Sequence, residues 1–199
     1  MSVAILKYNA GNVFSVKCAL QRLGVEAVLT DDAAELRRAS HVLFPGVGEA
    51  STAMAYLRGH GLDEVIKSLT QPVLGICIGL QLMCRSSQEG GTRGLGIFDA
   101  DVTRFDASAT PECKVPHMGW NTLDIAAANA LLPPGQLEGR YVYFVHSYFA
   151  PVCTHTIATT TYINPFSAAL HRDNYWATQF HPEKSGSVGE LVLKNFLAL

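Results

Sequence analysis

The strongest constraint on the fold is a regular alternation of short apolar runs and helical patterns over the first 83 residues. Val3–Leu6 and Val73–Ile76 are four-residue runs of the kind found in fully buried strands. Between them, apolar residues from Val13 to Leu23 recur at helical spacing, and Gly24 follows where a helix would end. Further strands are expected at Ala27–Leu29 and His41–Phe44, and further helices across 51–69 and around Gln81–Met83. Strand–helix alternation of this kind predicts a doubly wound α/β fold, with a largely parallel sheet covered by helices on both faces.

The pattern changes in the second half of the chain, where strands follow one another with short links. They are expected at Ile97–Phe105, Arg140–Val145, His155–Tyr162 and Trp176–Phe180. These strands predict a mixed or antiparallel extension of the sheet. A last helix is expected to begin at a capping box formed by Ser187 and Glu190. Because the 199 residues contain no long linker, we expect one domain over residues 1–199.

The charge balance argues against polyanionic partners. There are 15 Lys and Arg against 17 Asp and Glu, and the formal charge is −2. A protein that binds nucleic acid or an anionic membrane in bulk usually carries a basic patch, so neither partner is expected. Charged residues make up 16% of the chain, which leaves much uncharged surface and favours a protein partner.

The cysteines point to a reducing compartment. Their number, five, is odd, and none forms a Cys-x-x-Cys pair. No apolar run is as long as a membrane span, and the first residues lack the features of a signal peptide. A cytoplasmic protein is therefore expected, in which one cysteine is reactive.

Cys77 is the candidate for that reactive residue. In Gly75-Ile76-Cys77-Ile78-Gly79, a strand leads into a helix with the cysteine at the turn and a glycine on either side. This arrangement resembles a nucleophile elbow, in which the helix N-terminus favours the thiolate. The amide of Ile78 would face a developing oxyanion. A buried structural cysteine in a tight turn is the alternative.

A cysteine nucleophile needs a base, and Phe180-His181-Pro182-Glu183 offers one. If this segment is extended, His181 and Glu183 face the same way, and the carboxylate can orient the imidazole. Pro182 is expected to keep the segment from becoming helical. Among the seven histidines, His146 is the main rival, although it has no carboxylate close to it in sequence.

Two further patterns concern anions and metals. Gly46 and Gly48, after the third expected strand, can expose backbone N–H groups to an anion or a carbonyl oxygen, although an ordinary turn explains them equally well. The histidines and cysteines show no metal-ligand spacing, so neither a metal nor a cofactor is expected.

Taken together, these motifs resemble the class I glutamine amidotransferases. The resemblance rests on Pro45–Gly48, Gly75–Gln81 and Phe180–Glu183, which occur in that order. Three more segments resemble one branch of the family, the glutaminase subunits of imidazole glycerol phosphate synthase, an enzyme of histidine biosynthesis. They are Asn9-Ala10-Gly11-Asn12, Val115–Asn121 and Tyr143–Tyr148. The resemblance extends over essentially the whole chain.

The resemblance implies a role for individual residues. Cys77 would attack the carboxamide of glutamine to form a thioester, His181 would transfer the protons, and Glu183 would orient His181. Oxyanion donors would come from Ile78 and the loop Gly46-Val47-Gly48. The residues that would hold the amino-acid head of the substrate are Gln81, Glu89, Ser147 and Tyr148. For Glu89, a plain loop carboxylate is the alternative.

The resemblance also implies a partner, because nothing in this chain would consume the ammonia. A separate (β/α)₈-barrel cyclase subunit would use it to make imidazole glycerol phosphate and an aminoimidazole carboxamide ribonucleotide. Residues matching the family's interface with that subunit are Asn12, Pro116, Met118, Trp120 and Lys184. Met and Trp are common in interface cores, but a loop Trp can also fold back on its own domain.

Two alternatives remain open at this point. One is the glutaminase subunit of pyridoxal phosphate synthase, against which the segments Val115–Asn121 and Tyr143–Tyr148 argue. The other is a binding or regulatory module that keeps the fold without activity. The intact set of Cys77, His181 and Glu183 argues against it.

Overall fold

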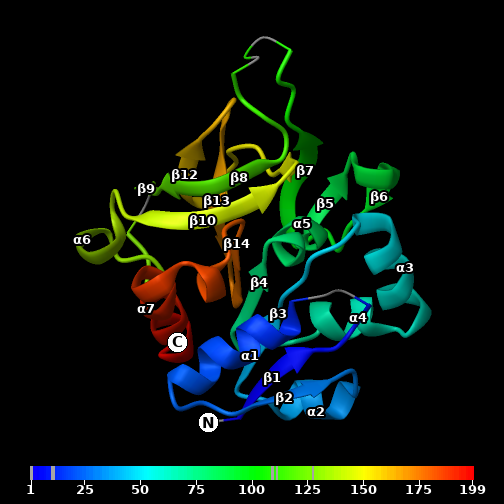
Figure 1. Cartoon of the computed structure of the whole chain (residues 1–199). Helices are drawn as coiled ribbons and strands as arrows, with labels where there is room; N and C mark the ends of the chain where they lie inside the picture. The colour runs from blue at the N-terminus through cyan, green and yellow to red at the C-terminus, as the bar shows by residue number, and fades with distance from the viewer. Residues whose placement is uncertain (1, 10–11, 109, 111, 127) are drawn as a thin grey trace.

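The structure is a computed structural model that describes residues 2–9, 12–108, 110, 112–126 and 128–199. Within them, eight strands form the main sheet in the order β2-β1-β3-β4-β14-β13-β12-β9 (Figure 1). The first five strands of that order are parallel, and the last three add antiparallel pairs. Their bounds are β1 Val3–Leu6, β2 Ala27–Thr30, β3 His41–Phe44, β4 Val73–Ile76, β14 Tyr175–Thr178, β13 Pro165–Arg172, β12 Thr156–Thr161 and β9 Asp124–Ile125.

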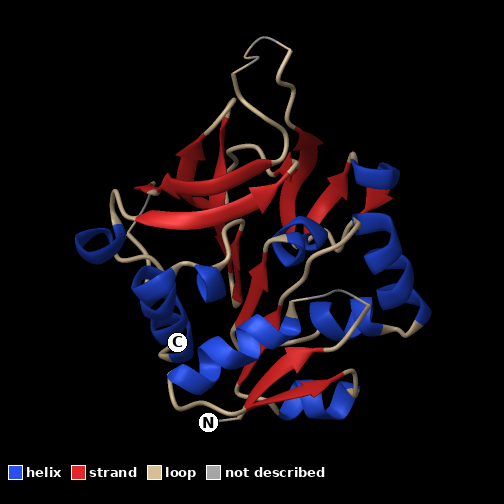
Figure 2. Cartoon of the chain, viewed as in Figure 1, coloured by secondary structure: helices blue, strands red, loops and turns tan. Residues whose placement is uncertain are grey.

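Helices cover both faces of the parallel part (Figure 2). Along β1, Val3 and Ile5 belong to one apolar core, whereas Ala4 and Leu6 belong to the other. The first core is completed by α1 (Val13–Arg22) and α7 (Gly186–Leu197), and the second by α2 (Ala33–Arg38), α3 (Ala50–Gly59) and α4 (Leu62–Lys67). Because successive side chains of a strand point to opposite faces, a buried strand must be apolar throughout, as β1 is. The predicted doubly wound α/β fold is confirmed.

Two smaller sheets lie beside the main one. An antiparallel pair joins β10 (Tyr141–His146) to β8 (His117–Thr122), and a four-stranded sheet has the order β11-β7-β5-β6. The remaining elements are β5 Cys84–Ser87, β6 Thr92–Arg93, β7 Phe98–Arg104, β11 Tyr148–Phe149, α5 Ile78–Met83, α6 Pro134–Leu137, η1 Glu89–Gly91 and η2 Pro182–Lys184. The mixed extension predicted for the second half is present. No helix among the described residues is long and apolar enough to cross a membrane.

The predicted start of the last helix is wrong. Helix α7 begins at Gly186, so Ser187 lies inside its first turn and Ser185 takes the N-cap position. The Ser185 hydroxyl accepts a hydrogen bond from the backbone N–H of Tyr143 at 3.0 Å and donates one to the carbonyl of His181 at 2.7 Å. Ser185 thereby ties β10 to the segment that carries His181.

The turn from β4 into α5 depends on two glycines. A Cβ atom on Gly79 would lie 2.0 Å from the carbonyl oxygen of Phe44, and one on Gly75 would lie 3.0 Å from the backbone of Gly79. The helix therefore begins in direct contact with the end of β3. This contact fixes where Cys77, between the two glycines, is placed.

We predict that Gly79→Ala destabilises the protein, because the backbone at Phe44 must move to admit the methyl group. Overpacking of this kind reduces the free energy of unfolding by about 1–3 kcal/mol. Thermal or denaturant unfolding measures it. The matched control is Gly135→Ala, where a Cβ meets nothing within 4 Å. Equal unfolding midpoints for the two variants would contradict the close contact.

Candidate active site

Cys77 occupies a strained turn at the end of β4. Its backbone has φ 54° and ψ −106°, in the positive-φ region that residues with a side chain rarely adopt. Its backbone N–H donates to the carbonyl of Thr178 at 2.8 Å, and its carbonyl accepts from the N–H of Gln81 at 3.3 Å. A strained cysteine at a strand-to-helix turn has the backbone geometry of the predicted elbow.

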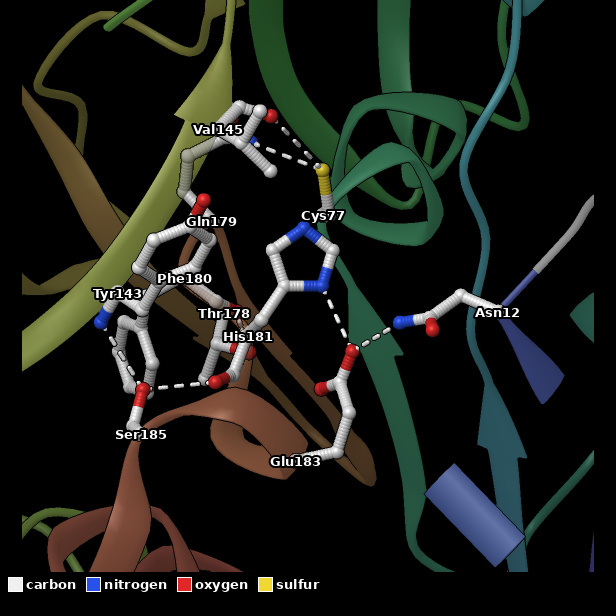
Figure 3. A network of polar contacts seen from close by, with 10 residues as sticks. All are labelled: Asn12, Cys77, Tyr143, Val145, Thr178, Gln179, Phe180, His181, Glu183 and Ser185. Carbon is white, nitrogen blue, oxygen red and sulfur yellow. Dashed lines mark hydrogen bonds and ion pairs between the residues drawn. The ribbon is translucent and has the colours of Figure 1, made fainter. Parts of the chain in front are cut away.

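His181 reaches Cys77 because of the order of the strands. β14 lies next to β4 in parallel, with Thr178 opposite Ile76, so both strands end at the same edge of the sheet. Cys77 follows one strand, and His181 comes three residues after the other. Figure 3 shows the imidazole beside Cys77, with Nδ1 turned toward Glu183. Edges of this kind are where sites form in open α/β sheets.

The imidazole of His181 is oriented by a buried carboxylate. Its Nδ1 lies 2.7 Å from Oε1 of Glu183, and both side chains are almost completely buried. The same Oε1 accepts a hydrogen bond from Nδ2 of Asn12. The contact between His181 and Glu183 was predicted, but the extended backbone predicted for this segment is wrong. Pro182 is instead the first residue of the short 3₁₀ helix η2, a position where the missing backbone N–H of proline has no partner to lose.

The surroundings of His181 favour its charged form. Burial is the largest single effect on the pKa of His181 and lowers it. The charge and hydrogen-bonding effect of Cys77, together with the hydrogen bond and charge of Glu183, outweigh burial and raise the pKa to about 10. Nε2 of His181 has no hydrogen-bond partner among the described residues and faces the sulfur in Figure 3. The structure thus places a charged imidazole ring beside the sulfur of Cys77.

His146, the alternative candidate for the base, forms its hydrogen bonds with Tyr148 and His117. Its Nδ1 lies 2.8 Å from the carbonyl oxygen of Tyr148, and its Nε2 lies 3.2 Å from Nδ1 of His117. Burial lowers the pKa of His146 to about 3 and that of His117 to about 4. Both rings are therefore neutral at physiological pH, and neither has a carboxylate partner.

A cavity of about 240 Å³ opens beside Cys77. It is lined by most of the residues that were predicted to form the oxyanion hole or to hold the substrate. Three other lining residues were not predicted to contact the substrate: Val145, His146 and Pro116, of which Pro116 was predicted for the partner interface. The lining residues are Val47, Gly48, Cys77, Ile78, Gln81, Glu89, Pro116, Val145, His146 and Ser147. Gly46 and Tyr148 are not among them, although the carbonyl of Tyr148 accepts a hydrogen bond from Gln81 at 2.8 Å.

Glu89 brings a carboxylate to this cavity. Its Oε2 accepts a hydrogen bond from the backbone N–H of Ala50, at the start of α3, at 2.9 Å. The pKa of Glu89 is raised above its ordinary value, mainly by burial. The hydrogen bond from Ala50 opposes this rise, and the nearby charge of Glu49 adds to it. A cationic group of a ligand in the cavity would offset the burial of this carboxylate.

The residues predicted for a partner interface lie on or next to β8, η2 and α1. Met118 and Trp120 of β8 are 64% and 54% exposed, so Trp120 does not fold back into the core. Trp120 stacks edge-to-face on Tyr143, and the ammonium of Lys184 lies 5.9 Å from the centre of the Tyr143 ring. Asn12 instead contacts Glu183, and its neighbours Ala10 and Gly11 lie outside the described residues.

Sequence reasoning missed Gln179, although it directly precedes Phe180-His181-Pro182-Glu183. Its side chain is completely buried, and its Nε2 lies 3.7 Å from the sulfur of Cys77. Its position next to a motif on the edge of the sheet was the available signal. Among the residues that the structure describes, no group of three or more His, Cys, Asp or Glu side chains could hold a metal ion.

Comparison with known proteins identifies the family. The model of the family described as "Glutamine amidotransferase class-I" matches residues 7–199. The imidazole glycerol phosphate synthase subunit HisH of Bacteroides thetaiotaomicron is 61% identical over 199 residues, covering 100% of both chains. The HisH subunit of Salmonella typhimurium is 46% identical over 202 residues, again covering 100% of both. The chain belongs to the HisH branch of the class I glutamine amidotransferases.

Solved structures of glutamine amidotransferases share the fold. One aligns with a TM-score of 0.74 at 19% identity, covering 98% of this chain and 97% of the other. Another, from Thermotoga maritima, aligns with a TM-score of 0.65 at 15% identity, covering 99% and 82%. The predicted resemblance to the class I glutamine amidotransferases and to their HisH branch is confirmed, which decides against the pyridoxal phosphate synthase alternative.

We predict that the charge of His181 contributes to stability in a pH-dependent way. Because its pKa in the folded protein, about 10, lies above the ordinary value of 6.5, the folded state holds the proton more tightly. The stability lost in His181→Asn should be largest below pH 6.5 and should shrink as the pH rises toward 10. Unfolding of both proteins across this range measures the difference. A difference that grows with pH would contradict the charged pair.

Proposed function

We propose that Cys77, His181 and Glu183 are the catalytic residues with which this HisH glutaminase subunit of imidazole glycerol phosphate synthase hydrolyses glutamine. The observation that carries the proposal is the buried His181–Glu183 pair, which faces a strained cysteine on the wall of a cavity. An inactive module would have no need to keep this arrangement, with its buried carboxylate and left-handed cysteine.

The reaction proceeds in two steps. The thiolate of Cys77 attacks the carboxamide carbon, and a C–S bond forms while the C–N bond breaks. His181 gives its proton to the departing nitrogen, which leaves as ammonia. Neutral His181 then takes a proton from water, the hydroxide attacks the thioester carbon, and glutamate leaves Cys77. Glu183 holds the ring in one orientation throughout.

Backbone N–H groups stabilise the oxyanion in both steps. Ile78 lies at the start of α5, next to Cys77, and Val47 and Gly48 line the same cavity. We further propose that the loop Gly46-Val47-Gly48 rearranges to complete the oxyanion hole. The positive φ of Gly48, 139°, is consistent with a backbone segment that glycine alone accommodates easily.

Polar groups of the cavity bind the amino-acid head of glutamine. The carboxylate of Glu89 pairs with the substrate ammonium, and Ser147 offers a hydroxyl to the substrate carboxylate. Both N–H groups of the Gln81 amide are taken by Tyr148 and Gln179, so Gln81 offers its oxygen. Tyr148 contributes through its carbonyl, which fixes the amide of Gln81.

The ammonia passes to a separate partner, the (β/α)₈-barrel cyclase subunit. An exposed surface formed by Met118, Trp120, Tyr143 and Lys184, which we call the docking face, supports this part of the proposal. Aromatic residues and Met are enriched where protein interfaces are most buried. Asn12 contacts the carboxylate of Glu183, and Pro116 lines the cavity. These two residues would therefore connect the docking face with the active site.

We predict that Cys77→Ala abolishes glutamine hydrolysis, because no other group can form the thioester. The assembled enzyme should still make imidazole glycerol phosphate from added ammonia, which shows that the variant folds and docks. Glutamate release and product formation measure the two activities. Full glutaminase activity in Cys77→Ala would refute the assignment of the nucleophile.

We predict that Trp120→Ala weakens binding to the cyclase without unfolding the chain, because the indole is half exposed. Loss of a central aromatic side chain weakens an interface by about 2 kcal/mol, or about thirtyfold. Titration calorimetry measures the affinity. The control is Leu29→Ala on β2, the outermost strand at the opposite end of the main sheet, which should bind as wild type does. An unfolded Trp120→Ala variant, or equal affinities, would contradict the docking face.

A further inference from the structure

The sulfur of Cys77 has a polar neighbour that the mechanism above does not use. Nε2 of Gln179 lies 3.7 Å from it (Figure 3). Gln179 follows Thr178 at the end of β14, as Cys77 follows Ile76 at the end of β4, and Thr178 and Ile76 are paired. The side chain of Gln179 is 0% exposed. A completely buried amide must satisfy its donors within the protein.

The orientation of the Gln179 amide follows from a backbone carbonyl. The carbonyl oxygen of Tyr148 can only accept, so the group of Gln81 that lies 2.8 Å from it must be the donating nitrogen. This nitrogen also lies 3.1 Å from one end of the Gln179 amide, which must then be the oxygen. The other end, turned toward the sulfur, is therefore N–H.

The same carbonyl fixes two histidines on its other side. Nδ1 of His146 must donate to Tyr148, and burial keeps the ring neutral, so its Nε2 accepts from Nδ1 of His117 at 3.2 Å. Nε2 of His117 in turn faces Nδ2 of Asn121 at 3.5 Å. That nitrogen is fixed as a donor by the carbonyl of Thr161, at 3.0 Å. The hydrogen bonds from Asn121 through His117 and His146 to Tyr148 therefore all run in one direction, toward the carbonyl of Tyr148.

We propose that Gln179 is a further catalytic residue: its amide N–H donates to the sulfur of Cys77, stabilises the thiolate and holds it in place for attack. Gln81 is a positioning residue that fixes the direction of this donor. In the thiol form, the S–H group faces the carbonyl of Val145 at 3.9 Å, whereas a thiolate can only accept. The N–H of Gln179 therefore favours the reactive form. This inference rests on the proposed role of Cys77 as the nucleophile.

The test compares Gln179→Met with wild type, because Met fills a similar volume without a donor. Iodoacetamide is applied across pH 5–10, and modification of the Cys77 peptide is followed by mass spectrometry, which separates it from the four other cysteines. We expect alkylation of Cys77 at neutral pH to slow about tenfold and its pH midpoint to rise by about one unit. In the complex with the cyclase, kcat for glutamine should fall about tenfold, with a smaller change in KM.

The controls separate this role from a structural one and from failure of the proposed function. Gln136→Met, the same change on the exposed face of α6, should alkylate as wild type does, and ammonia-driven synthesis should persist in Gln179→Met. An unchanged rate and pH profile in Gln179→Met would overturn the proposal. If Cys77→Ala kept its glutaminase activity, the proposed function itself would fail.

A second readout tests the polarity of the network in the wild-type protein. Nitrogen NMR should find the proton of both His117 and His146 on Nδ1, with Nε2 unprotonated, at neutral pH. This pattern is required if the carbonyl of Tyr148 fixes the direction of every donor. A proton on Nε2 of His146 would contradict the assigned direction of the hydrogen bonds between His117, His146 and Tyr148.

Discussion

The contact between Gly79 and the carbonyl of Phe44 is the constraint on which the site depends. A helix can begin this close to a strand only where no side chain intervenes, so Gly79 brings α5 against the end of β3. The preceding turn then holds Cys77 at a positive φ, with its sulfur beside the cavity. Because β14 lies next to β4 in parallel, His181 and Gln179 arrive at the same edge. The site is therefore a consequence of strand order and one close backbone contact.

Burial of charge is the second physical feature of the site. His181 and Glu183 are hidden from solvent, and the same carboxylate oxygen also binds Asn12. Asn12 occupies the position before α1 with φ 69°, a left-handed conformation that Asn tolerates better than most residues. Removing one partner from such a group leaves a buried charge unpaired, which is strongly unfavourable. This cost explains why the carboxylate of Glu183 is held by residues from both ends of the chain.

Much of the fold could be predicted because its signals are local. Short apolar runs mark β1, β3 and β4, and the helical stripe marks α1. The elements that were not predicted lack such signals: β13 begins with Pro165, and β8 alternates buried His117 with exposed Met118 and contains Gly119. Their pairing depends on distant segments, which local periodicity does not report. The cap of α7 was misassigned because Ser185 is held by tertiary contacts to Tyr143 and His181.

The proposed triad of Cys77, His181 and Glu183 could be recognised because its residues lie in short motifs, whereas the hydrogen-bond network behind it could not. The link from Gln179 to His117 passes through the carbonyl of Tyr148, and a backbone group leaves no mark in a sequence.

The most direct test of the central claim is to quench the complex with acid during turnover of glutamine and to map covalent adducts by mass spectrometry. We predict a glutamyl thioester on Cys77. An adduct on another cysteine, or turnover of glutamine without any thioester, would contradict it.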